Sequence, residues 1–146
     1  MIDGRPNIVS LEDEGGDNHG MTLLHSAAAD GQISLVAVLL DAGADPDARG
    51  ASGWTPLAYA CGNDEHGASV VSYLLEHGAD PHALNHDNST ALHIAAASNN
   101  VDICKLLIAA GSDVNALTND GHSALNLASR NAAPTCVATL LDAGAY

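Results

Sequence analysis

Two short phrases recur in step along the chain, and this internal repetition constrains the fold more than any other feature. The first phrase reads HGMTLLHSAAADG at residues 19–31 and returns at 52–63, 87–99 and 120–132. Its anchoring hydroxyls are spaced by 33, 35 and 33 residues and belong to Thr22, Thr55, Thr90 and Ser123. A period of this length indicates a solenoid in which each unit buries its apolar face against its neighbours.

The second phrase, VLLDAGADPDA in the first unit, ends each copy around a glycine. These glycines are Gly43, Gly78, Gly111 and Gly144, spaced by 35, 33 and 33 residues. The two extra residues of the second unit therefore lie between Thr55 and Gly78. The stretch GNDEHGAS at residues 62–69 is the natural place for them.

Each unit predicts two short helices and a turn. The recurring hydroxyl can cap the first helix, and Pro56 follows one of these caps at a position where its missing N–H costs nothing. The second helix places Leu35, Val36, Leu39 and Leu40 on one face at helical spacing. The glycine of the second phrase ends that helix, and an exposed turn leads to the next unit.

These residues resemble the ankyrin repeat family. The matching phrases are TPLAYAC, TALHIAAA and LLIAAGSDVNA, although Ala58 and Asn126 stand where the family has histidine. The resemblance implies an all-α solenoid of stacked helix-turn-helix units joined by β-hairpin-like turns. We expect an acidic, flexible segment at 1–16 and a four-repeat domain at 17–146. The expected repeats span about 17–49, 50–84, 85–117 and 118–146.

The last repeat carries two polar substitutions that suggest an end to the array. Ser129 stands where earlier repeats have Ala28, Cys61 and Ala96, and Thr139 stands where they have Val38, Tyr73 and Leu106. A terminal repeat has one face without a neighbour and is expected to be polar there. We therefore expect repeat four to be a C-terminal cap. The alternative is that the chain is a fragment of a longer array.

Charge and cysteine content narrow the function classes. The chain has 4 Lys and Arg against 18 Asp and Glu, a net charge of −14, which argues against a nucleic-acid binder and against binding to an anionic membrane surface. The longest aliphatic run, LVAVLL, is too short to span a bilayer, and the N-terminus lacks the apolar core of a signal peptide. Three cysteines without a CxxC spacing favour a reducing compartment. We expect the cytoplasm or nucleus, or a bacterial cytoplasm.

The residues that often carry chemistry have structural explanations here. His25 and His93 fall at the repeat's own histidine position, where the imidazole can bond to backbone in neighbouring turns. The spacing of the eight histidines does not indicate a zinc site, and no nucleophile–base arrangement is evident. We expect no catalytic residue, no cofactor and no metal. The phrase LLIAAGSDVNA also resembles the ankyrin sequence in which the asparagine, here Asn115, is hydroxylated in animals. The alternative is that Asn115 braces its turn.

The family resemblance implies a protein-interaction module, an adaptor or scaffold, that binds through turn tips and the concave face of the first helices. The alternative is a stoichiometric regulator, inhibitor or assembly chaperone of a single target. Aligning the turns gives the candidate partner-binding residues Met21, Asp30, Arg49, Trp54, Asn63, Leu84, His86, Leu117, Asn119 and His122. Trp54 stands out as the only Trp, either as a binding anchor or packed on the next turn. The acidic residues favour a basic partner or simply keep a monomer soluble.

Overall fold

A computed structural model describes residues 21–63 and 65–146 of the chain. The expected acidic segment at 1–16 lies outside the described residues. Within them the chain forms helices and no strand. The elements are α1 (Leu23–Ala29), α2 (Ile33–Asp41), the short 3-10 turn η2 (Ala51–Gly53), α3 (Pro56–Ala60), α4 (Gly67–Glu76), α5 (Ala91–Ala97), α6 (Val101–Ala109), α7 (Ala124–Arg130) and α8 (Pro134–Asp142). No helix of this described part is both long enough and apolar enough to cross a membrane.

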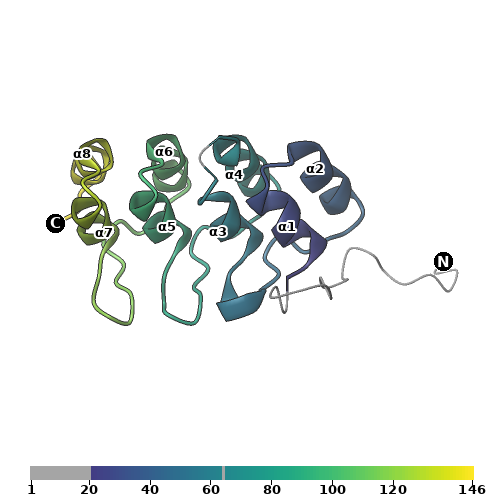
Figure 1. The fold of residues 1–146 in the computed structure, drawn as a ribbon, viewed down its shortest axis with the longest axis horizontal. Coiled ribbons are helices and arrows are strands. Elements are labelled where there is room, and N and C mark those ends of the chain that lie inside the picture. The colour runs from purple at the N-terminus through teal and green to yellow at the C-terminus, as the bar shows by residue number, and fades with distance from the viewer. Residues whose placement is uncertain (1–20, 64) are drawn as a thin grey trace, which may run out of the picture.

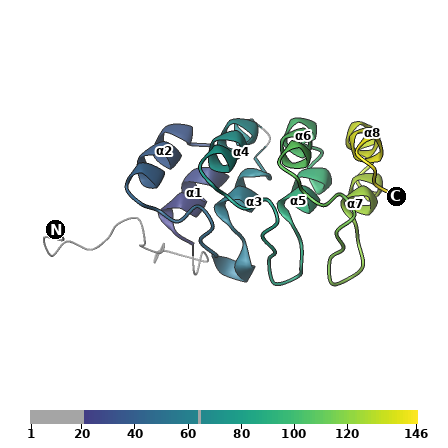
Figure 2. The same ribbon diagram turned by 180° about the vertical axis from the view of Figure 1, so that it is seen from behind.

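The helices stack as four successive pairs in two parallel rows (Figure 1). One row holds α1, α3, α5 and α7, which we call the inner helices, and the other holds α2, α4, α6 and α8, the outer helices. The long turns between repeats all project from the inner row, away from the outer helices (Figure 2). The expected all-α solenoid of helix-turn-helix units is therefore confirmed.

Each inner helix begins directly after the Thr or Ser whose hydroxyl was expected to cap it. Thr22, Thr55, Thr90 and Ser123 are the N-cap residues, and each hydroxyl accepts from the backbone N–H three residues on. In three of the four repeats the side chain at that third position also accepts from the backbone N–H of the cap residue, completing a capping box. The exception is repeat two, where that position is Ala58.

The core follows the two rows of helices. One leucine from each outer helix points into it, and Leu39, Leu74, Leu107 and Leu140 are all buried. Leu24, Leu57 and Leu92 play the same part on the inner helices, with small alanines such as Ala95 and Ala96 between them. The small side chains let neighbouring repeats approach closely, which is how a chain without Phe fills its core.

The two extra residues of repeat two lie where the sequence places them. The connection between α3 and α4 spans residues 61–66, whereas the equivalent connections span 30–32, 98–100 and 131–133. The longer loop returns to the helix at Gly67. A Cβ atom at Gly67 would lie 2.4 Å from the carbonyl oxygen of Ala60, so only glycine fits this close approach.

The C-terminal end of the array differs from the expected polar cap. Val38 in the first outer helix is 62% exposed, whereas its equivalents Tyr73 and Leu106 pack against the core, so this position faces the preceding repeat. Thr139 therefore faces repeat three rather than the open end, and its hydroxyl donates to the carbonyl of Thr135 at 2.9 Å. The open face is lined by Ser129 and by apolar residues, including Leu141, which is 51% exposed. Of the two polar substitutions, only Ser129 lies on the face that no described repeat covers, and the role of repeat four as a cap stays a prediction.

Candidate partner-binding surface

The turns between repeats form a hydrogen-bonded ladder. The N–H of residues 50, 85 and 118 donates to the carbonyl of Trp54, Ser89 and His122 respectively, closing each turn at 2.9, 3.1 and 3.0 Å. Adjacent turns are joined by two further bonds of 2.9 Å, from the N–H of His86 to Ser52 and from the N–H of Asn119 to Asp87. This ladder holds the exposed side chains of neighbouring turns in fixed relative positions.

Two histidines fasten the inner helices to the turn that follows. The Nδ1 atom of His93 accepts from the N–H of Thr90, and its Nε2 atom donates to the carbonyls of Ala116 and His122 at 3.0 and 3.1 Å. His25 makes the equivalent bond to the carbonyl of Trp54 at 2.9 Å. Burial lowers the pKa of both imidazoles, so they stay neutral near pH 7. Their expected structural role is confirmed.

Repeat two has Ala58 in place of this histidine, and a hollow is present on its inner helix. The hollow has a volume of about 280 Å³ and is lined by Trp54, Ala58, Tyr59, Gly62 and Ile94. We call it the repeat-two groove. In repeat one the ring of His25 contacts Tyr59 edge-on, with ring centroids 5.5 Å apart. Ile94 is the equivalent of Tyr59 one repeat later, so we expect an imidazole at position 58 to lie against Ile94, one wall of the groove.

Trp54 forms one wall of the repeat-two groove. Its side chain is half-buried, and its carbonyl accepts from both His25 and Gly50. The other apolar walls are the half-buried side chains of Tyr59 and Ile94. Aligning the turns missed these two residues, although each follows its cap hydroxyl by four positions and the shared spacing was a usable signal.

Most of the predicted binding residues are exposed to solvent. Leu84 and Leu117 are 42% and 58% exposed, but neither lines the groove beside Trp54. The remaining exposed members are Asp30, Arg49, His86 and Asn119, and the half-buried ones are Trp54, Asn63 and His122.

The prediction that Met21 lies on the surface is wrong. Its side chain is only 7% exposed, so it offers almost no area to a partner. An unbranched apolar side chain at the head of α1 is more stable out of water than in it. Met21 precedes its cap hydroxyl just as Trp54 does, but its side chain is buried whereas that of Trp54 is half-buried.

Three of the predicted binding residues also connect neighbouring repeats. The Arg49 guanidinium donates to the backbone carbonyls of Gly53 and Leu84. The amide of Asn63 donates to the carbonyl of Ala29 at 3.0 Å, and that of Asn119 donates to the carbonyl of His86 at 3.2 Å. These side chains therefore hold neighbouring repeats together in addition to lying on the surface.

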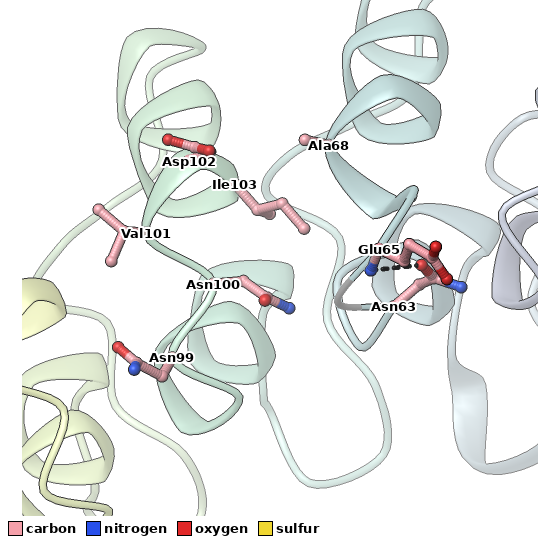
Figure 3. Close-up of a pocket in the computed structure, with 8 residues that line it drawn as sticks. All are labelled: Asn63, Glu65, Ala68, Asn99, Asn100, Val101, Asp102 and Ile103. Atoms are coloured by element: carbon pink, nitrogen blue, oxygen red, sulfur yellow. Dashed lines mark hydrogen bonds between the residues drawn. The ribbon is translucent and has the colours of Figure 1, made fainter.

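A second hollow lies between the connections of repeats two and three (Figure 3). Its volume is about 320 Å³, and we call it the acidic pocket because it contains two exposed carboxylates, Glu65 and Asp102. Its other lining residues are Asn63, Ala68, Asn99, Asn100, Val101 and Ile103. Asn63 accepts from the N–H of Glu65 at 3.1 Å, and Asn100 donates to the carbonyl of Cys61 at 2.7 Å, so both amides are engaged by the fold.

Asn115 braces the end of the array. Its Oδ1 atom accepts from the N–H of Tyr146 at 3.2 Å, and its amide donates to the carbonyl of Gly144 at 3.4 Å. Asn115 therefore braces its turn, which is one of the two roles expected for it. Its hydroxylation stays a prediction.

The three cysteines are buried and unpaired. Burial raises the pKa of the Cys104 thiol to about 12, and it raises the pKa values of Cys61 and Cys136 as well. The Sγ atoms of Cys104 and Cys136 are 3.9 Å apart, well beyond the length of a disulfide bond. Within the residues that the structure describes, no three His, Cys, Asp or Glu side chains are grouped to hold a metal ion.

The sequence matches the family description "Ankyrin repeats (3 copies)" twice, over residues 4–85 and 65–146. The chain belongs to the ankyrin repeat family. Members of this family generally mediate protein–protein interaction.

Individual relatives match over shorter stretches. The neurogenic locus notch homolog protein 1 of Xenopus tropicalis is 37% identical over 93 residues, and the Danio rerio homologue matches equally; each alignment covers 63% of this chain. The potassium channel AKT1 of Oryza sativa subsp. indica is 46% identical over 41 residues, or 28% of this chain. In each case the matched region is about 4% of the relative's own length.

Proposed function

We propose that this chain is an adaptor or scaffold domain that binds a partner protein through its turn tips and inner helices, with the repeat-two groove at the centre of the contact. The groove carries the proposal, because it is a hollow with three large apolar walls, Trp54, Tyr59 and Ile94, open on the inner helices. Partly exposed Trp and Tyr side chains in such pockets often contribute most of the binding energy.

The proposed role is binding rather than catalysis. Among the described residues, the buried His25 and His93 are bonded to turns, and burial raises the pKa of each of the three cysteine thiols, which makes them poor nucleophiles. We also propose that the chain resides in the cytoplasm or nucleus, or in a bacterial cytoplasm, since a reducing compartment suits three unpaired cysteines. We also propose a monomer, since the net charge of −14 opposes self-association. Light scattering on the protein as it elutes from a size-exclusion column measures its molar mass and tests whether it is a monomer.

The test of binding uses a variant that fills the groove and a matched control. Three forms of the protein are immobilised: the original chain, the Ala58→His variant and the Ala109→His variant. Proteins that each form captures from a cell extract are identified by mass spectrometry. Ala109 is exposed on α6 and does not line the groove. We expect a partner held by the original chain and by Ala109→His but released by Ala58→His. If every captured protein binds all three forms equally, the groove is not the site.

The alternative role, a stoichiometric regulator, inhibitor or assembly chaperone, differs in one measurable respect. If the captured partner is an enzyme, its activity changes when one equivalent of the chain is added. An adaptor leaves that activity unchanged while still forming the complex.

A further inference from the structure

The size of the repeat-two groove limits what can enter it. Its volume of about 280 Å³ lies just below the range of about 300–1,000 Å³ that is typical of small-molecule sites. Its floor is made of Ala58 and Gly62, the smallest residues in the lining, and its walls are large and apolar. These dimensions suit one large apolar side chain of a partner rather than a whole ligand.

The acidic pocket lies directly beside the groove. Gly62 lines the groove and the next residue, Asn63, lines the acidic pocket, so the two hollows share one short piece of backbone. The carboxylates of Glu65 and Asp102 are exposed in this pocket, and neither hollow has a Lys or Arg among the described residues of its lining. The Nε2 atom of His66 lies 3.8 Å from the carboxylate of Glu65, and this histidine neutralises Glu65 only when it is protonated.

We propose that the groove and the acidic pocket together recognise a segment of the partner in which a large apolar side chain and a Lys or Arg lie a few residues apart. This inference rests on the proposed function and names the chemistry of the partner. The apolar side chain enters the groove and supplies most of the affinity by leaving water. The cationic side chain enters the acidic pocket, where Glu65 and Asp102 stand on opposite sides (Figure 3). It contributes mainly to the association rate and to specificity.

A selection from a displayed library of random peptides tests this chemistry without knowledge of the natural partner. The full chain is the bait. We expect the selected peptides to share a large apolar residue with Lys or Arg nearby. Their affinity is expected to fall at least tenfold for Ala58→His and severalfold for the double variant Glu65→Gln, Asp102→Asn. The control Ala109→His should bind as the original chain does.

Several results would overturn the inference. These are selected peptides without basic residues, peptides that bind Ala58→His undiminished, or a selection that enriches nothing. Failure here is distinguishable from failure of the proposed function. If a captured partner protein is lost with Ala58→His but unaffected by Glu65→Gln with Asp102→Asn, the groove is the binding site and the cationic part of the inference is wrong.

Discussion

Ala58 occupies the position that carries His25 in repeat one, His93 in repeat three and Asn126 in repeat four. The two histidines cap their own helix and bond to the following turn. Alanine can do neither, and the space beside it is part of the repeat-two groove. A histidine at this position thus bonds its helix to the following turn in repeats one and three, whereas Ala58 makes no such bond in repeat two.

Ala58→His is therefore expected to close the groove without weakening the fold. The new imidazole can bond to the carbonyl of Ser89, as His25 bonds to that of Trp54, and a net gain of about 1 kcal/mol is typical for such a bond. Urea denaturation should show an unfolding free energy at or above that of the original chain. A clear loss of stability would mean that the space at position 58 is not the imidazole site.

The buried histidines predict a loss of stability in acid. Burial lowers the pKa of His25 and His93 below 6.5, so the unfolded chain binds more protons than the folded one as pH falls through that value. The unfolding free energy should therefore be greatest above about pH 6.5 and decrease below it. Thermal melts between neutral and mildly acidic pH measure this.

A His93→Asn variant isolates the imidazole contribution. Asn126 occupies the same position in repeat four and still accepts from the N–H of Ser123 at 2.9 Å, so asparagine preserves the cap. The variant should be less stable at neutral pH, because the bonds to Ala116 and His122 are lost. Its stability should also fall less on acidification. An unchanged pH dependence would show that His93 does not titrate as proposed.

At the scale of helices and turns, the caps and apolar spacings were readable from the sequence because they act within a few residues. Thr90 begins α5 where the repeat predicts it, and the extra residues of repeat two lie in the α3–α4 connection. The contacts between repeats were not readable. Arg49 reaches the carbonyl of Leu84, 35 residues away, and Asn63 reaches that of Ala29, 34 residues away. The pairing of Tyr59 with Ile94 likewise requires knowledge of how the repeats stack.

Two glycines near the α3–α4 connection differ in what they tolerate. Gly67→Ala places a Cβ atom 2.4 Å from the carbonyl oxygen of Ala60, and such overpacking costs about 1–3 kcal/mol. Gly62→Ala meets its nearest atom at an ordinary 3.7 Å and should leave stability nearly unchanged. Chemical denaturation of the two variants side by side measures the difference. Equal stabilities would contradict the close approach at Gly67.

At the scale of the whole molecule, charge repulsion opposes both folding and self-association. The net charge of −14 is distributed over a small domain with few cations to offset it. Added salt screens this repulsion, so the melting temperature should rise between low and near-physiological ionic strength. Scanning calorimetry at several salt concentrations measures this rise. A melting temperature that falls with salt would show that favourable ion pairs outweigh the repulsion.

A partner protein is proposed to dock in the repeat-two groove. The most direct test of this docking is the dissociation constant of a captured partner for Ala58→His, compared with the original chain and with Ala109→His, by titration calorimetry. We predict a dissociation constant at least tenfold larger for Ala58→His, with the control unchanged. Equal affinity for all three forms, with Ala58→His fully folded, would contradict the claim.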